Sequence, residues 1–85
     1  MKISGTAGFW AAYHQLPPEI RQKARKQYRL WLKNPEHRSL RFKKIKSFWS
    51  ARINVRYRTL GIMASDTVVW FWIGTHADYD KLLRS

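Results

Sequence analysis

The chain has 85 residues, no cysteine, and 17 Lys and Arg against five Asp and Glu, which gives a formal net charge of +12. This length allows one small domain near the lower limit for an adequate core, and the lack of cysteine excludes disulfides and thiolate metal sites. The longest apolar run, Val68 to Ile73, is too short to cross a bilayer. The residues after Met1 lack a signal-peptide pattern. We therefore expect a cytoplasmic protein that does not span a membrane.

The N-terminal half has the periodicity of a helical hairpin. Ser4 or Thr6 is suited to cap a first short helix, and Pro17-Pro18 ends it. A second helix is expected from Glu19 to Asn34-Pro35, with basic side chains opposite one apolar stripe. That stripe consists of Ile20, Ala24, Tyr28, Trp31 and Leu32. Four tryptophans are expected in the core: Trp10, Trp31, Trp70 and Trp72.

The C-terminal half changes to the period of strands. Leu40 to Ile45 is expected to form a strand, and Trp49 to Val55 alternates as a strand with one solvated face does. Tyr57 to Met63 would be the returning strand, and Thr67 to Ile73, apolar on both faces, a central strand covered on each side. Asp78 to Arg84 would form one closing helical turn. The order predicts an α+β fold, with the hairpin packed on a small, mainly antiparallel, twisted sheet.

Basic residues dominate the middle of the chain. Fourteen Lys and Arg lie between Arg21 and Arg58, against the single acid Glu36. Aromatic and β-branched residues are interleaved with them, so this segment is not a solvated tail. A folded surface this cationic is expected to bind a polyanion, and phosphate is the first candidate because each contact releases counterions. The few, scattered acids disfavour a Mg²⁺ site, which needs carboxylates. We expect neither a metal nor a cofactor.

Four segments together resemble a known family. They are Leu40 to Ile45, Phe48 to Ile53, Tyr57 to Gly61 and Trp72 to Tyr79. The most specific parts are Trp-Ser-x-Arg-Ile, the Tyr-Arg that follows it, and Gly-Thr-His after the last strand. In this order they resemble the RelE/ParE superfamily of toxins from bacterial toxin–antitoxin pairs. The resemblance covers nearly the whole chain, so we expect a single domain over residues 1–85. It implies a RelE-like sheet with a basic concave surface opposite the helical hairpin.

The resemblance implies more than one activity. Many members cut mRNA in the ribosomal A site without a metal ion, whereas the ParE branch poisons DNA gyrase, and the fold does not decide between them. We expect a ribosome-dependent mRNA endoribonuclease, because a gyrase-binding protein would not need the proton donor His76 beside Arg58. A third possibility is an RNA- or ribosome-binding module whose site has decayed. The implied partners are mRNA, the ribosome and an acidic antitoxin laid across the basic face.

Three residues are candidates for the chemistry. Arg58 matches the strand arginine that clamps the scissile phosphate in the family, a task suited to a guanidinium fork. His76 resembles the terminal histidine used as a general acid or base in the YoeB and YafQ branches. Tyr79 is placed to stack on a base or shuttle a proton, or to pack against the sheet edge. The alternatives are a solvated strand residue for Arg58 and a helix cap for His76.

Five further cations are candidates to hold the RNA backbone: Lys43, Lys44, Lys46, Arg52 and Arg56. Alternation along the expected strands would place Arg52 and Arg56 on one face, and either Lys43 or Lys44 toward the site. A lysine taken alone is more often a solvated surface charge. The chain also departs from the family, because Ser50 and Arg52 stand where RelE has an alternating lysine pair. It has no counterpart to the glutamate of YoeB, which leaves a scheme based on histidine and arginine.

Overall fold

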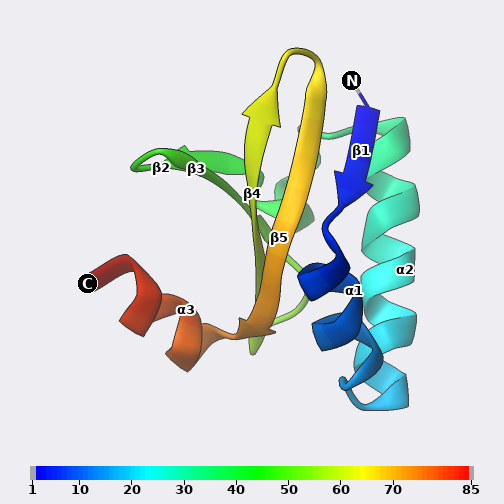
Figure 1. The fold of residues 1–85 in the computed structure, drawn as a ribbon. Coiled ribbons are helices and arrows are strands. Elements are labelled where there is room, and N and C mark those ends of the chain that lie inside the picture. The colour runs from blue at the N-terminus through cyan, green and yellow to red at the C-terminus, as the bar shows by residue number, and fades with distance from the viewer. Residues whose placement is uncertain (1, 85) are drawn as a thin grey trace.

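The computed structural model describes residues 2–84, which form a mixed sheet with helices on both of its faces (Figure 1). The strand order is β1-β5-β4-β3-β2, and every neighbouring pair is antiparallel except β1 with β5. The α+β architecture expected from the sequence is confirmed. No helix within residues 2–84 is long and apolar enough to cross a membrane. In chain order the elements are β1 Lys2–Gly5, α1 Ala7–His14, α2 Pro18–Lys33, the 3-10 helix η1 Arg38–Leu40, β2 Lys43–Ile45, β3 Phe48–Arg52, β4 Tyr57–Ala64, β5 Thr67–Thr75 and α3 His76–Arg84.

The helical hairpin is confirmed, and local signals set its limits. Thr6 is the N-cap of α1, where its Oγ1 accepts a hydrogen bond from the backbone N–H of Phe9 at 3.1 Å. Pro18 begins α2, where its missing N–H leaves no hydrogen bond unmade. The strand β1 was not predicted from the sequence. It is only four residues long and becomes a strand by pairing with β5, which lies far along the chain.

A β-bulge determines which side chains of β5 enter the core. Leu60 of β4 lies opposite Trp72, whereas Gly61 lies opposite Trp70, so Phe71 is an additional residue in β5. Before the bulge Trp70 points to the helices, and after it Ile73 does. A Cβ on Gly61 would lie 2.8 Å from Cε3 of Trp70 and 2.9 Å from the carbonyl oxygen of Val69. The bulge therefore requires glycine at position 61.

The core lies between the sheet and the helices α1 and α2. Its buried residues are Phe9, Trp31, Leu40, Ala51, Ile53, Val68, Trp70 and Ile73. Trp31 and Trp70 are buried as expected, but the core assignment of Trp10 was wrong, because its side chain is 48% exposed and covers Gly5. Trp72 is also outside this core and packs beside Tyr79 on the opposite face of the sheet. Almost every residue of α1 is apolar, so periodicity could not identify its buried side.

Three other boundaries differ from the expectation. Strand β3 ends at Arg52 rather than Val55, because Asn54 Oδ1 accepts hydrogen bonds from the backbone N–H groups of Arg56 and Tyr57, both at 2.9 Å. This side chain closes a loop where alternation predicted a strand. Arg41 adopts a left-handed conformation with φ of 46°, which confines β2 to three residues. Helix α3 is longer than one turn, since Thr75 Oγ1 accepts from the N–H of Asp78 at 3.2 Å and caps it.

Substitution of Gly61 tests the bulge. We expect Gly61→Ala to lower the free energy of unfolding by about 1–3 kcal/mol, because the added methyl meets both backbone and a buried ring. Urea denaturation followed by circular dichroism measures this change. Gly8→Ala is the control, since a Cβ on Gly8 meets nothing closer than Thr6 Oγ1 at 3.9 Å, and it should leave stability unchanged or slightly raised. Equal stability of the two variants would contradict the packing argument.

Candidate nucleic-acid interface

Two arginines face each other across β3 and β4. Arg52 and Arg58 are directly opposite in the ladder, so both side chains project from the face of the sheet that carries α3. Burial lowers the pKa of Arg58, and the positive charges of Arg52 and Arg41 lower it further, whereas Tyr79 and Asp80 act in the opposite direction. Arginine remains protonated even so. The fold therefore holds together cations that repel one another, which favours the binding of an anion.

The guanidinium of Arg58 is held in one orientation. Its Nη1 donates to the carbonyl oxygen of Asn54 at 2.6 Å and to that of Tyr57 at 3.0 Å. Within residues 2–84, no hydrogen bond uses its Nε or Nη2, so these N–H groups remain for a ligand. Asn54 thus shapes the loop with its side chain and orients Arg58 with its carbonyl. Sequence reasoning missed this role, although asparagine is a common loop former.

His76 is the first residue of α3 and lies beside the same loop. Its backbone N–H donates to the carbonyl oxygen of Arg56 at 2.6 Å. Its Nδ1 lies 3.2 Å from Oδ2 of Asp80, one helical turn later, and both side chains are about half exposed. Asp80 was not among the residues singled out from the sequence, although its spacing of four from His76 places the two on one side of a helix. The pair resembles the histidine and orienting carboxylate of many catalytic sites.

An open depression of ≈ 310 Å³ brings three of the candidate residues together. Arg56, Arg58 and His76 line it, with Val55, Thr75 and Ala77. The expectation that Arg52 and Arg56 share a strand face was wrong, because Arg56 belongs to the loop after β3. The loop nevertheless brings Arg56 to the site. Val55 is strongly exposed at the rim and offers an apolar contact beside the cations.

Tyr79 occupies a different environment from these three residues. It is 6% exposed, and its hydroxyl donates to Ser50 Oγ at 3.0 Å. Its ring lies beside those of Trp72 and His76, with centroid distances of 6.4 and 5.7 Å. These contacts correspond to the packing alternative. Tyr79 anchors α3 on the sheet and so positions His76 above the depression.

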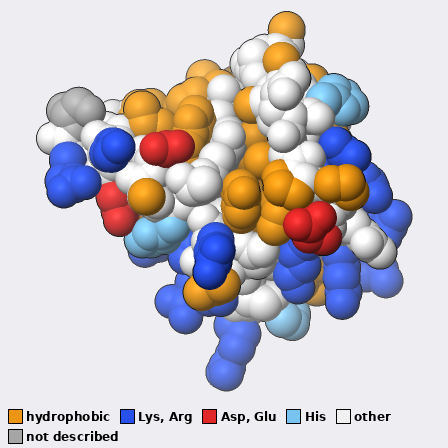
Figure 2. Space-filling view, turned by 90° about the horizontal axis from the view of Figure 1, so that it is seen from below, with side chains coloured by type: hydrophobic (Ala, Val, Ile, Leu, Met, Phe, Trp, Pro, Cys, Tyr) orange, Lys and Arg blue, Asp and Glu red, His pale blue; other side chains and the backbone are white. Residues whose placement is uncertain are grey.

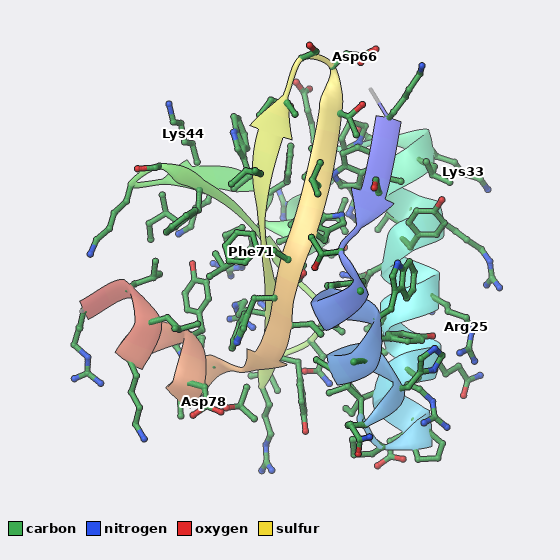
Figure 3. The ribbon with its side chains drawn as sticks, viewed as in Figure 1. Arg25, Lys33, Lys44, Asp66, Phe71 and Asp78 are labelled. Atoms are coloured by element: carbon green, nitrogen blue, oxygen red, sulfur yellow. The ribbon has the colours of Figure 1, made fainter. Side chains whose placement is uncertain are left out.

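The three lysines of the β2–β3 hairpin point in different directions. Lys43 lies opposite Ser50 and so shares the face of Arg52, whereas Lys44 lies opposite Trp49 on the other face. Figure 3 shows the Lys44 side chain extending away from α3. Lys46, in the hairpin turn, donates from Nζ to the carbonyl oxygen of Leu83 in α3. Lys43 is therefore the lysine of this group that extends the arginine surface.

Basic side chains project from the edges of the face seen in Figure 2. Seen from below, Lys and Arg project along the lower and right-hand edges of the molecule, and acidic side chains occupy few places (Figure 2). With the net charge of +12, this distribution matches the electrostatic footprint of a protein that binds a polyanion.

Comparison with known families identifies the chain. The model of the ParE-like toxin domain matches residues 18–81, which include both arginines of the ladder and His76. The chain belongs to this family. It is a toxin domain of the RelE/ParE superfamily, as its motifs indicated. Comparison with curated proteins gave no significant match.

Solved structures show the same fold for this ParE-like toxin domain. It is similar to the toxin in the RelB–RelE antitoxin–toxin complex from Methanococcus jannaschii, with a TM-score of 0.72, 16% identity and coverage of 93% of this chain and 96% of that one. The YoeB/ParE toxin from Agrobacterium tumefaciens gives a TM-score of 0.68 at 18% identity, and the match covers 89% of this chain and 99% of that toxin. YafQ from E. coli strain BL21(DE3) gives a TM-score of 0.66 at 12% identity, and the match covers 92% of this chain and 96% of YafQ. At these identities the likeness concerns the fold.

The hydrogen bond between Tyr79 and Ser50 should stabilise the ParE-like domain, and a double-mutant cycle measures its contribution to the free energy of unfolding. Tyr79→Phe leaves the buried Ser50 hydroxyl without a partner, so we expect a loss of about 1–3 kcal/mol in unfolding free energy. Tyr79→Phe with Ser50→Ala removes both polar groups and should recover most of that loss. Thermal and urea unfolding of the parent, both single variants and the double variant give the coupling. Additive losses would show that the bond is unimportant.

The opposed arginines predict a conflict between stability and binding. Arg52→Gln should raise the free energy of unfolding by about 0.2–1 kcal/mol at low salt, because it removes a like charge opposite Arg58. The same substitution should weaken binding to single-stranded RNA and reduce its salt dependence. Lys44→Gln is the charge-matched control, since Lys44 lies opposite Trp49 and should not gain this stability. A gain that persists in concentrated salt would mean that repulsion is not its cause.

Proposed function

We propose that this ParE-like domain is the toxin of a type II toxin–antitoxin pair and acts as a ribosome-dependent mRNA endoribonuclease in the cytoplasm. One observation carries the proposal: the oriented guanidinium of Arg58 and the imidazole of His76 line the same open depression. A phosphate-binding cation and a group that exchanges protons near neutral pH are the two parts that RNA cleavage requires of such a site.

The proposed reaction uses the RNA itself as nucleophile. The 2′-oxygen attacks the adjacent phosphorus, the bond to the 5′-oxygen breaks, and the products are a 2′,3′-cyclic phosphate and a 5′-hydroxyl. The 2′-hydroxyl loses a proton and the 5′-oxygen gains one. Because Nδ1 of His76 faces Asp80, its Nε2 is the atom available for one of these transfers.

The cations would stabilise the charge that develops at phosphorus. Arg58 would clamp the scissile phosphate through Nε and Nη2, since its Nη1 is already bound to the loop. Arg56 lies beside it in the depression, and Arg52 and Lys43 continue the basic surface along the sheet. They would hold the flanking backbone, with Lys44 and Lys46 at the periphery. Tyr79 would keep His76 in place rather than transfer a proton itself.

The second candidate is a DNA gyrase poison, because the family model is ParE-like and the fold is shared by several toxins. The pairing of His76 with Asp80 favours the nuclease, since binding alone requires no oriented histidine. An acidic antitoxin is proposed as protein partner. Several of the similar solved structures are toxin–antitoxin complexes, among them RelB–RelE and DinJ–YafQ, and a toxin of charge +12 suits an acidic protein.

Cleavage by purified toxin on ribosomes programmed with a short mRNA tests the mechanism. Arg58→Ala should nearly abolish cleavage, and Arg58→Lys should not restore it, because an ammonium lacks the guanidinium fork. His76→Gln should lower the rate about 10²–10⁴-fold with little change in ribosome binding. The matched control is His14→Gln, at an exposed histidine at the end of α1 on the other side of the sheet. A 2′-deoxy nucleotide at the cut position should block the reaction.

Three outcomes would contradict this proposal, each in a different part. Parental cleavage by the His76→Gln variant would remove His76 from the chemistry. Growth arrest with intact mRNA and induction of the DNA-damage response would establish the gyrase alternative instead. Binding to ribosomes without cleavage by the parent protein would identify a decayed, non-catalytic module.

A further inference from the structure

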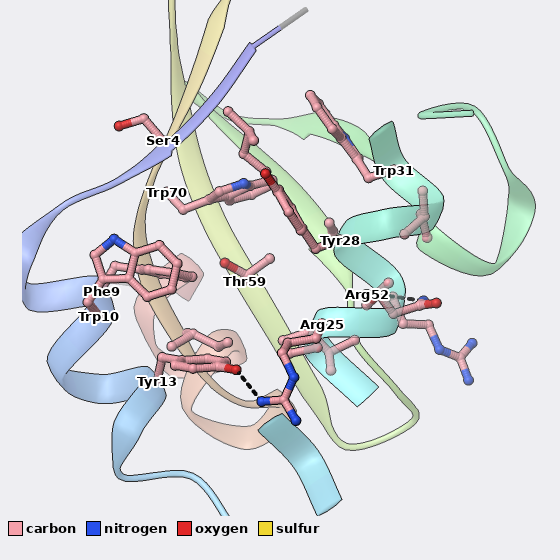
Figure 4. A pocket seen from close by; sticks show the side chains of 17 residues that line it. Ser4, Phe9, Trp10, Tyr13, Arg25, Tyr28, Trp31, Arg52, Thr59 and Trp70 are labelled. Carbon is pink, nitrogen blue, oxygen red and sulfur yellow. Dashed lines mark hydrogen bonds between the residues drawn. The ribbon is translucent and has the colours of Figure 1, made fainter. Parts of the chain in front are cut away.

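The two faces of the sheet each have a concave region, and only one of these regions has an acid–base pair. On the helix side, an apolar groove of ≈ 230 Å³ is bordered by α1, α2 and the strands (Figure 4). Within residues 2–84, no histidine, aspartate or glutamate lines this groove, and the Arg52 side chain extends away from it (Figure 4). On the other face, His76 lines the depression, with its Nδ1 3.2 Å from Oδ2 of Asp80. Of the two regions, only the depression therefore has a group that exchanges protons near neutral pH.

Contacts elsewhere in α3 hold both members of this pair in place. The backbone N–H of His76 donates to the carbonyl oxygen of Arg56 at 2.6 Å, which fixes the start of the helix. Tyr79, the residue before Asp80, is 6% exposed and donates its hydroxyl to Ser50, which fixes the rotation of the helix about its axis. The spacing of four then places Asp80 on the same side of α3 as His76. The contact between the pair therefore follows from how α3 is anchored, although both side chains are half exposed.

The order of the two residues is unfavourable for the helix itself. His76 is the first residue of α3, at the end where the helix dipole stabilises anions rather than cations. An acid placed four residues before a base stabilises a helix better than the reverse order, and here the base comes first. The pair is thus poorly arranged for stabilising α3. A conflict of this kind between local stability and the observed arrangement is typical of functional sites.

The charge of Asp80 is also unfavourable for the binding of an anion. Burial lowers the pKa of Arg58, and the negative charge of Asp80 acts in the opposite direction, so the carboxylate is close enough to interact with the guanidinium. A negative charge at this place weakens the attraction of Arg58 for a phosphate. The chain has only five acidic residues, yet one of them lies here. The benefit of Asp80 must therefore lie in the contact of its carboxylate with Nδ1 of His76.

We propose that Asp80 is a positioning residue for RNA cleavage, an assignment that rests on the function proposed above. Its carboxylate accepts a hydrogen bond from Nδ1–H of His76, which fixes the imidazole ring and its tautomer. Nε2 is then the atom that exchanges a proton with the RNA. Asp80 itself stays ionised, touches neither the RNA nor the phosphorus, and stabilises the imidazolium whenever Nε2 carries a proton. Binding and chemistry thus make opposite demands on this residue.

The Asp80→Asn variant separates binding from chemistry. Asparagine and aspartate have similar helix propensities, so α3 should remain folded. Loss of the charge should tighten binding to ribosomes programmed with an mRNA that is 2′-deoxy at the cut position, by about 2–5-fold at low salt. The single-turnover rate with all mRNA bound should fall at least about 10-fold, and by no more than the roughly 10²–10⁴-fold loss expected for His76→Gln. A purely structural residue would not move affinity and rate in opposite directions.

Three further measurements serve as controls. Asp78→Asn removes the same charge from the first turn of α3, where Asp78 is exposed (Figure 3), and it should cleave at the parental rate. Asp80→Glu keeps a carboxylate within reach of the imidazole and should recover most of the rate lost in Asp80→Asn. In the His76→Gln background, Asp80→Asn should lower the rate no further, because Asp80 acts through His76.

NMR of the imidazole nitrogens tests the position of the proton directly. Long-range ¹H–¹⁵N spectra distinguish a ring nitrogen that carries a proton from one that does not. The chain has three histidines, and the variants His14→Gln and His37→Gln assign their signals. In the parent, Nδ1 of neutral His76 should carry the proton. Asp80→Asn should give a mixture of the two tautomers, whereas Asp78→Asn should keep the parental spectrum.

Several results would overturn the proposal. These are parental cleavage by Asp80→Asn, an equal loss of rate from Asp80→Asn in the His76→Gln background, or an unchanged His76 tautomer in Asp80→Asn. Parallel losses of affinity and rate, with a weaker helical signal in circular dichroism, would also overturn it and assign Asp80 a structural role. Failure of the parent protein to cleave RNA would instead refute the nuclease. The tautomer in Asp80→Asn would then still decide whether Asp80 positions His76.

Discussion

The register between β3 and β4 is the constraint on which the rest of this structure depends. It places Arg52 directly opposite Arg58, an arrangement that repulsion opposes in a chain already carrying a charge of +12. Asn54 closes the loop between the two strands with its side chain and binds the Arg58 guanidinium with its carbonyl. In the same loop, the carbonyl oxygen of Arg56 accepts a hydrogen bond from the backbone N–H of His76. A small number of backbone contacts thus brings the cations and the histidine to one depression.

The aromatic core on the other side of the sheet offsets this repulsion. Trp31 and Trp70 are buried there, and the bulge opposite Gly61 lets β5 contribute both Trp70 and Ile73 to the same face. Gln27 adds a polar tie, because its side-chain amide reaches from α2 to the carbonyl oxygen of Arg52 at 3.1 Å. The helical hairpin therefore supports the strand that carries one of the opposed arginines. The aromatic core and the charged surface thus lie on opposite faces of one sheet.

Much of the fold could be predicted from local signals, and the errors lie where such signals are absent or where other contacts override them. Prolines and capping residues set the ends of α1 and α2 independently of tertiary packing, so the hairpin was predicted correctly. β1 is too short to show a period. Alternation continues to Val55, but Asn54 diverts the backbone N–H groups that a longer β3 would need. Trp10 was assigned to the core because α1 is apolar on every side, and only packing decides which face is covered.

The sequence by itself determined the family, the class of fold, the cationic character and the prominence of Arg58 and His76, because motifs and net charge do not depend on how the chain packs. Tertiary structure alone decided which groups meet. It placed Arg52 against Arg58, set Asp80 beside His76, buried the Tyr79 hydroxyl on Ser50 and left an apolar groove between the two helices. The physical reason is that these relations depend on strand register, a bulge and helix placement. Each is fixed by contacts between residues distant in sequence, which no local pattern encodes.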